Sequence, residues 1–126
     1  MTTVILIGGP PMSGKSTLTS DLSKKYNCPW VSSDFIRSWM KSIVSKKDYP
    51  SLFNFENISA EEHYKKHSIE ETIKQEEARD KDVFIGVENF ILKNDEWDFF
   101  IVEGISIRPE FVSNIKIKNL KIIPFF

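Results

Sequence analysis

The stretch Val4-Ile5-Leu6-Ile7-Gly8-Gly9-Pro10-Pro11-Met12-Ser13-Gly14-Lys15-Ser16-Thr17 carries the strongest indication of the fold. It begins as a continuous apolar run and then matches the pattern G-x-x-x-x-G-K-[ST] from Gly9 to Ser16. A helical pattern follows, in which Leu18 and Leu22 lie four residues apart. Between a strand and a helix, this pattern predicts a loop whose backbone N–H groups bind phosphate.

Each part of the loop has a chemical role in that prediction. Lys15 can reach the outer phosphates as a point charge, and the Ser16 hydroxyl can bind Mg²⁺. The N-terminus of the following helix adds a partial positive charge. An ordinary turn rich in Gly, Pro and Ser is the alternative. The residues predicted to contact a nucleotide are Gly9, Pro10, Pro11, Met12, Ser13, Gly14, Lys15, Ser16 and Thr17.

Composition predicts a single domain over residues 1–126, because 126 residues with 40% hydrophobic content suit one core. The formal net charge of −1 gives no electrostatic footprint for nucleic acid. Cys28 is the single cysteine, and we find neither a targeting segment nor an apolar run of roughly 20 residues that would span a membrane. We therefore expect a soluble, cytoplasmic protein; the oligomeric state cannot be predicted.

Apolar runs alternate with amphipathic stretches along the chain, which predicts an α/β fold with a mostly parallel sheet and flanking helices. Leu120 to Phe126 resembles a buried strand that stops abruptly, so we expect a C-terminal piece to be missing. The expected strands are Val4 to Gly8, Trp30 to Ser33, Asp98 to Gly104 and Leu120 to Phe126. The expected helices are 15–26, one capped by Asp34, 61–79 after a capping box at Ser59, the amphipathic segment 82–92, and a short one at 110–113.

Two acids follow expected strands at the edge where ligands bind in open α/β sheets. Glu103 ends an apolar strand and can orient a metal-bound water, although it could instead cap a turn or pair with a lysine. Asp34 could simply cap a helix, or it could accept a proton from a substrate hydroxyl. Arg37 lies one helical turn later and could bind an anionic substrate group beside Asp34.

Two further candidates carry weaker predictions. His63 and His67 have a spacing that can chelate a metal, but two ligands are too few, so a solvated helix face is expected. Cys28 is expected to be a small, partly buried hydrophobic residue without a catalytic role. The segment 45–59, with three aromatic residues, is expected to be an irregular flap on the substrate side.

Four segments resemble the small P-loop kinases, and the nearest likeness is to the 2-phosphoglycerate kinase type and related P-loop phosphotransferases. These segments are 8–17, 32–40, 87–91 and 99–103. The resemblance implies a sheet of order 2-3-1-4-5, ATP with Mg²⁺ as donor, and Asp34 and Arg37 as the Asp-x-x-Arg step that acts on the acceptor hydroxyl. It also matches Glu103 to the acid that ends the third strand.

The chain departs from this pattern where the family continues into an arginine-bearing lid and a fifth strand. From the sequence we expect an ATP-dependent kinase for a small, anionic metabolite, with Lys15, Asp34 and Arg37 as catalytic residues and Ser16 and Glu103 at the metal. Two alternatives stay open. One is a nucleotide-binding remnant or regulatory module without turnover, and the other is a polynucleotide 5′-hydroxyl kinase.

Overall fold

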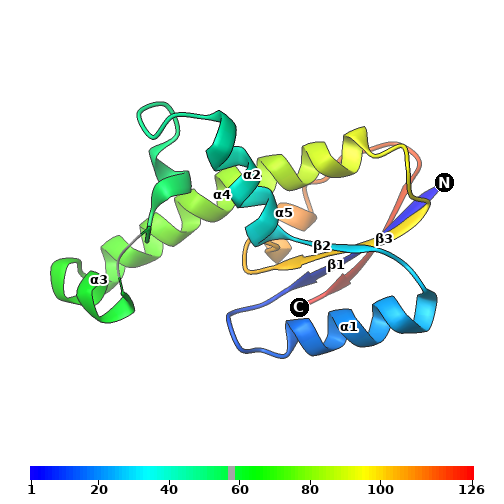
Figure 1. Ribbon diagram of the computed structural model, residues 1–126, viewed down its shortest axis with the longest axis horizontal. Coiled ribbons are helices and arrows are strands. Elements are labelled where there is room, and N and C mark those ends of the chain that lie inside the picture. Colours follow the sequence, from blue (N-terminus) through cyan, green and yellow to red (C-terminus); the bar gives the residue numbers. More distant parts are fainter. Residues whose placement is uncertain (57–58) are drawn as a thin grey trace.

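A parallel sheet of four strands forms the centre of the computed structural model, which describes residues 1–56 and 59–126 (Figure 1). The sheet order is β2-β3-β1-β4, and every neighbouring pair is parallel. This confirms the predicted α/β class, and the order agrees with the first four places of the order that the resemblance implies. The strands are β1 (Thr2–Gly8), β2 (Trp30–Ser32), β3 (Phe99–Gly104) and β4 (Leu120–Phe125).

Helices cover both faces of this sheet, as Figure 1 shows. On one face, α1 (Lys15–Tyr26) packs Leu18 and Leu22 against Ile5 and Ile7 of β1. The other face carries α2 (Ser33–Ile43), the C-terminal half of α4 (Ile69–Lys93) and α5 (Pro109–Val112). Alternate residues of β1 therefore enter opposite cores, which explains the continuous apolar run that marks this strand.

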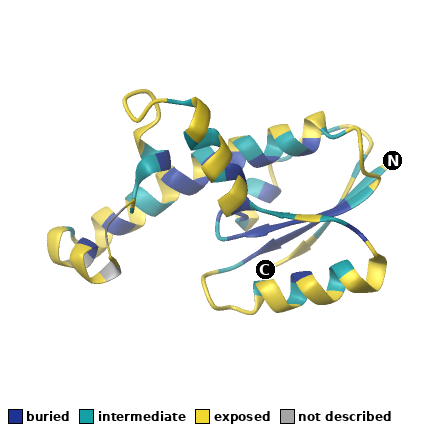
Figure 2. Cartoon of the chain, viewed as in Figure 1, coloured by how far each residue is buried: buried dark blue, intermediate teal, exposed yellow. Residues whose placement is uncertain are grey.

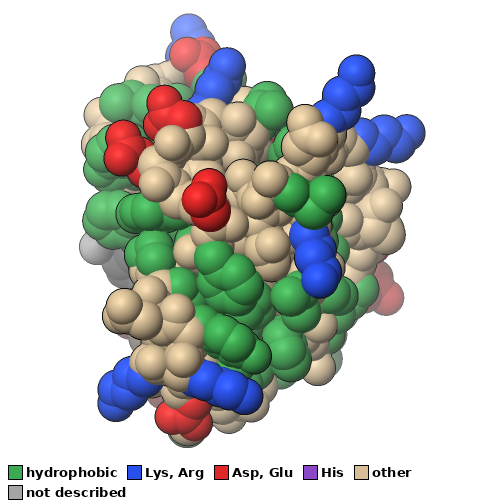
Figure 3. Space-filling model, turned by 90° about the vertical axis from the view of Figure 1, so that its right-hand side faces the viewer, with side chains coloured by type: hydrophobic (Ala, Val, Ile, Leu, Met, Phe, Trp, Pro, Cys, Tyr) green, Lys and Arg blue, Asp and Glu red, His purple; other side chains and the backbone are tan. Residues whose placement is uncertain are grey.

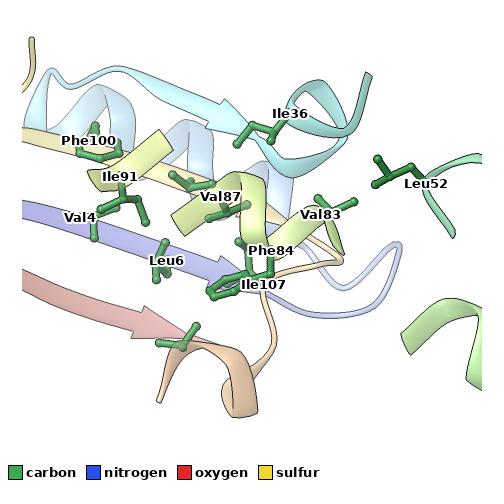
Figure 4. Packing of buried hydrophobic residues seen from close by; sticks show 12 residues of the cluster. Val4, Leu6, Ile36, Leu52, Val83, Phe84, Val87, Ile91, Phe100 and Ile107 are labelled. Atoms are coloured by element: carbon green, nitrogen blue, oxygen red, sulfur yellow. The ribbon is translucent and has the colours of Figure 1, made fainter. Parts of the chain in front are cut away.

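The larger core lies between β1, β3 and the helices α2 and α4 (Figure 4). Val4 and Leu6 of β1 and Phe100 of β3 are wholly buried, and they meet Val87 on α4. Figure 2 shows the same distribution, with buried residues along the central strands and exposed residues on the outer helix surfaces. The central strands thus form a rigid base for the loops at their carboxyl ends.

The helical region between β2 and β3 differs from the prediction in its boundaries. The expected helix 61–79 is divided into α3 (Ala60–Lys66) and the first half of α4, and the expected segment 82–92 continues α4 without a break. Ser68 explains the division, because its side chain accepts a hydrogen bond of 3.1 Å from the Glu71 N–H and begins a new helix. Ser59 caps α3 in the same way, as the capping box predicted.

Two further boundaries correct the prediction. The helix α2 is capped by Ser32, whose hydroxyl accepts from the Phe35 N–H at 3.0 Å, so Asp34 lies within the first turn instead of at the cap. β4 is not a buried strand, because it is the sheet edge beyond β1 and its residues are half-buried or exposed. The expected flap, residues 45–59, contains the short 3-10 helix η1 (Pro50–Phe53). Residues 57 and 58 of this expected flap lie outside the described residues.

No helix among the described residues is both long enough and apolar enough to cross a bilayer.

Candidate phosphate-binding site

The loop between β1 and α1 adopts a backbone shape that depends on its glycines. Gly9 has a φ of 145°, and Gly14, which caps α1, has a φ of 90°. A Cβ atom on Gly9 would lie 2.8 Å from the Ser13 hydroxyl oxygen. Both glycines of the G-x-x-x-x-G-K-[ST] pattern are therefore required by the backbone, which turns the loop directly into the N-terminus of a helix. Such an end presents N–H groups without intrahelical partners.

Lys15 turns back over this loop. Its Nζ atom donates a hydrogen bond of 2.7 Å to the carbonyl oxygen of Pro10. The ammonium group is therefore held at the loop, and it can exchange this carbonyl for a phosphate oxygen without moving far. Ser16 and Thr17 follow in the first turn of α1, and both are exposed.

Glu103 lies at the carboxyl end of β3, between the two neighbouring strands. Its Cα is in register with Ile7 of β1 on one side and Ser32 of β2 on the other. The residue is only 9% exposed. Burial raises the pKa of Glu103, the nearby carboxylate of Asp34 raises it further, and the ammonium of Lys15 opposes the rise. These electrostatic effects show that the structure brings Lys15, Asp34 and Glu103 into one neighbourhood.

Asp34 itself is exposed in the first turn of α2. Because Ser32 performs the capping, the carboxylate of Asp34 is not needed for helix termination. It therefore remains available at the same edge of the sheet as the loop and Glu103.

Arg37 makes contacts that the sequence did not predict. Its guanidinium donates from Nε to the Leu52 carbonyl at 2.9 Å and from Nη2 to the Asn54 carbonyl at 2.5 Å. Burial lowers the pKa of Arg37, and the neighbouring charge of Arg79 lowers it further. The side chain thus fastens the η1 segment to α2, and within the described residues it forms no ion pair with Asp34. Sequence spacing could not reveal this, because the two carbonyls lie 15 and 17 residues away.

Sequence reasoning missed a buried charge cluster around Asp80 on α4. Asp80 is 2% exposed and accepts from the Ser106 hydroxyl at 2.8 Å and from Arg79 Nε at 3.1 Å. Its other oxygen accepts from both Nε and Nη2 of Arg108, at 2.9 and 2.6 Å. In sequence Asp80 looks like one more charge on a solvated helix. Only Val83 and Phe84, three and four residues later on the same helix face, could have suggested burial.

A hollow of about 520 Å³, lined by both charged and apolar residues, lies between this cluster and the loop. The backbone side of the loop contributes Gly9 and Pro10, α4 contributes Arg79 and Asp80, and the segment after β3 contributes Arg108. The hollow is thus open to the predicted phosphate site and to two guanidinium groups at once.

A second hollow, of about 500 Å³, is almost wholly apolar and lies between α2 and the C-terminal half of α4. The exposed rings of Phe35 and Trp39 line it, and Trp97 closes one end. Figure 3 shows that hydrophobic side chains also gather on the surface that faces right in Figure 1, the side on which the N-terminus lies. This hollow shares no residue with the loop, and it contains none of the chemistry of the loop.

His63 does not lie on a solvated helix face, whereas His67 is half-buried at the C-terminal end of α3. His63 is 5% exposed, and its ring lies 4.5 Å from those of both Phe55 and His67. His67 forms a hydrogen bond of 3.1 Å through Nδ1 with a carboxylate oxygen of Glu71. In the part of the chain that the structure describes, no three His, Cys, Asp or Glu side chains converge as a metal site. Cys28 is buried as expected, and burial raises the pKa of its thiol.

Comparison with known proteins gives no family assignment. No protein-family model matches the chain, and no curated protein is significantly similar to it in sequence.

Proposed function

We propose that the protein is an ATP-dependent phosphotransferase that acts on a hydroxyl group of a small anionic metabolite. The observation that carries this proposal is the G-x-x-x-x-G-K-[ST] loop, with Lys15 folded onto it and the buried carboxylate of Glu103 beside it. The loop between strand and helix is the arrangement that phosphate binding requires. The parallel sheet of order β2-β3-β1-β4 is compatible with a P-loop fold.

The residues have separate roles in this proposal. The N–H groups of the loop and the ammonium of Lys15 bind the ATP phosphates. The Ser16 hydroxyl and the Glu103 carboxylate supply oxygen donors of the kind that Mg²⁺ prefers, with Glu103 acting through water. When bound, the metal neutralises charge on the phosphates. Oxygen donors at adjoining ends of α1 and β3 suit this ion.

Asp34 can take the proton from the hydroxyl group of the substrate, because its carboxylate is exposed and lies near enough to Glu103 to raise the pKa of that residue. Arg37 has a further role besides the one that the Asp-x-x-Arg spacing suggests. Two of its N–H groups donate to the carbonyls of Leu52 and Asn54, so it also fastens the η1 segment to α2.

Calorimetric titration of MgATP tests the proposal. We expect saturable binding that weakens at least about tenfold in Lys15→Ala, because a charge-assisted hydrogen bond contributes about 1.5–3 kcal/mol. Lys24→Ala, on an exposed residue of the same helix, is the matched control and leaves the affinity unchanged. Inorganic phosphate and GTP are the comparison ligands. ATP binding that is equal in wild type and Lys15→Ala would contradict the proposal.

A nucleotide-binding module without turnover is the second candidate, and one observation favours it. Arg108 could stabilise a transferring phosphoryl group, but Asp80 already binds two of its nitrogen atoms. An ADP-release assay with a panel of hydroxylated acids decides between the two. ATP binding without acceptor-dependent ADP release supports the module, whereas release that requires an acceptor supports the kinase. A polynucleotide kinase would instead show binding to DNA ends that falls steeply with salt.

A further inference from the structure

We propose that Arg79 and Arg108, held in place by the buried carboxylate of Asp80, form the subsite that binds the anionic group of the acceptor. This inference rests on the proposed function and assigns its substrate class. The ligand is a small hydroxylated compound that carries a carboxylate or a phosphate.

Asp80 fixes the two guanidinium groups but does not use all their donors. Arg108 gives Nε and one Nη2 hydrogen to Asp80, which leaves its Nη1 group and the second Nη2 hydrogen. Arg79 gives only Nε, and its guanidinium carbon lies 5.0 Å from the centre of the Phe55 ring, which restrains its plane. Two preoriented planar cations with remaining donors suit bidentate recognition of an oxyanion.

The charge of the hollow is mixed, because Arg79 and Arg108 share its lining with Asp80, Glu76 and Glu110. One buried carboxylate joins two guanidinium groups, and Arg37 lies near enough for its pKa to be lowered, chiefly by burial and then by the charge of Arg79. All three arginines of the chain therefore gather at this region. A bound carboxylate or phosphate would be attracted to the guanidinium groups of Arg79 and Arg108.

The size and the lining of the hollow indicate what the ligand carries besides its anionic group. Its volume of about 520 Å³ is within the range of small-molecule sites, and the loop residues Gly9, Pro10 and Pro11 form the wall beside the predicted ATP phosphates. Glu76 and Glu110 line it as well, and Glu110 lies 3.7 Å from Arg108 Nη1. These two carboxylates can accept hydrogen bonds from hydroxyl groups, so a polyhydroxylated acid fits better than a simple anion.

A purely structural ion cluster is the alternative, because buried salt bridges also occur without ligands. The two explanations differ in what conservative substitutions change. A structural role alters stability and leaves ligand binding alone, whereas a binding role alters affinity even where the fold is retained.

The test is calorimetric titration of glycerate and glycerol 3-phosphate, without nucleotide, into wild type, Arg79→Lys and Arg108→Lys. Glycerol is the uncharged comparison, and Lys116→Gln, on an exposed residue beyond α5, is the matched charge control. We expect at least one of the two anions to bind and each arginine variant to weaken it about tenfold or more, because lysine keeps the charge and loses the planar fork. The better anion shows whether the subsite prefers carboxylate or phosphate.

Two further measurements keep the outcome decisive. Lys15→Ala distinguishes binding in the hollow from binding in the phosphate loop. We expect glycerate or glycerol 3-phosphate to bind this variant as it binds wild type. Loss of binding in Lys15→Ala alone would place the anion in the loop and overturn the inference. If a lysine variant fails to fold, the three arginine Nε–H signals of the wild type serve instead. We expect glycerol 3-phosphate or glycerate to shift those of Arg79 and Arg108 much more than that of Arg37.

Equal probe affinity in wild type and both arginine variants, or glycerol binding as well as the anions, would refute the subsite. The kinase proposal fails separately, through ATP binding that does not depend on Lys15. An anion that binds at Arg79 and Arg108 when ATP does not bind would leave the subsite standing as an anion site alone. ATP binding without anion binding would retain the phosphate loop and remove the subsite.

Discussion

Replacing Asp80 by asparagine is the substitution for which the structure predicts a large loss of stability with almost no change in shape. The carboxylate is 2% exposed and accepts four hydrogen bonds, two on each oxygen, from Arg79, Ser106 and Arg108. Asparagine has one acceptor oxygen, so its NH₂ group must face either the guanidinium of Arg108 or the donors of Arg79 and Ser106. A donor would then lie against donors in a buried site.

The magnitude follows from these contacts. Keeping the oxygen toward Arg108 loses the two bonds to Arg79 and Ser106 and leaves two guanidinium charges without a buried counter-charge. Breaking a buried ion pair by removing one partner costs about 3–5 kcal/mol. A domain of this size has a free energy of unfolding of about 5–15 kcal/mol, so the variant should remain folded but be clearly weakened.

Urea unfolding followed by circular dichroism measures the effect. Asp21→Asn is the matched control, because Asp21 is exposed on α1 and its replacement should change the free energy of unfolding by less than about 0.5 kcal/mol. A loss below about 1 kcal/mol for Asp80→Asn, with an unchanged dependence on urea concentration, would refute the reasoning. The carboxylate would then not be the buried centre of the cluster.

Other substitutions test separate parts of the structure. Because burial raises the pKa of Glu103, wild type should lose stability as the pH rises from the ordinary glutamate pKa of 4.5 through the raised pKa. Glu103→Gln should lack this loss, so its stability relative to wild type should rise with pH. Urea unfolding of both proteins at pH 4 and pH 7 measures the difference. Arg37→Met should cost about 2–3 kcal/mol by releasing two carbonyls and should speed tryptic cleavage of the segment before η1; equal cleavage rates would contradict that role. Gly104→Ala places a methyl group 1.8 Å from the Ser33 hydroxyl oxygen at a φ of 152°, and it should lower the free energy of unfolding by about 2–6 kcal/mol. Gly14→Ala has a φ of 90° with open space around it, and it should lower the free energy of unfolding by only about 1–3 kcal/mol. Burial also raises the pKa of the Cys28 thiol, so native protein should react with a disulfide reagent far more slowly than protein in urea; similar rates would show that the thiol is accessible.

The strands and the first helix could be predicted because their signals are local. A continuous apolar run before a glycine-rich loop indicates a strand buried on both faces, and β1 and α1 lie where this pattern put them. The division at Ser68 was missed, although Ser68 and Glu71 repeat the capping pattern that was recognised at Ser59. An unbroken charged stretch hid a second cap of the same kind.

The candidate site also contains some residues that the sequence could predict and others that it could not. Gly9, Gly14 and Lys15 were identified from sequence because their spacing along the chain is itself the site, and Glu103 because strand ends in a parallel sheet meet at one edge. The Arg79–Asp80–Arg108 cluster depends on contacts between residues as many as 28 positions apart, and Arg37 on carbonyls beyond its own helix. The sequence by itself determined the glycine-rich loop at which we propose that phosphate binds, because the geometry of that loop is local. Only the tertiary structure decided which charges are buried and paired, because burial depends on how distant segments pack.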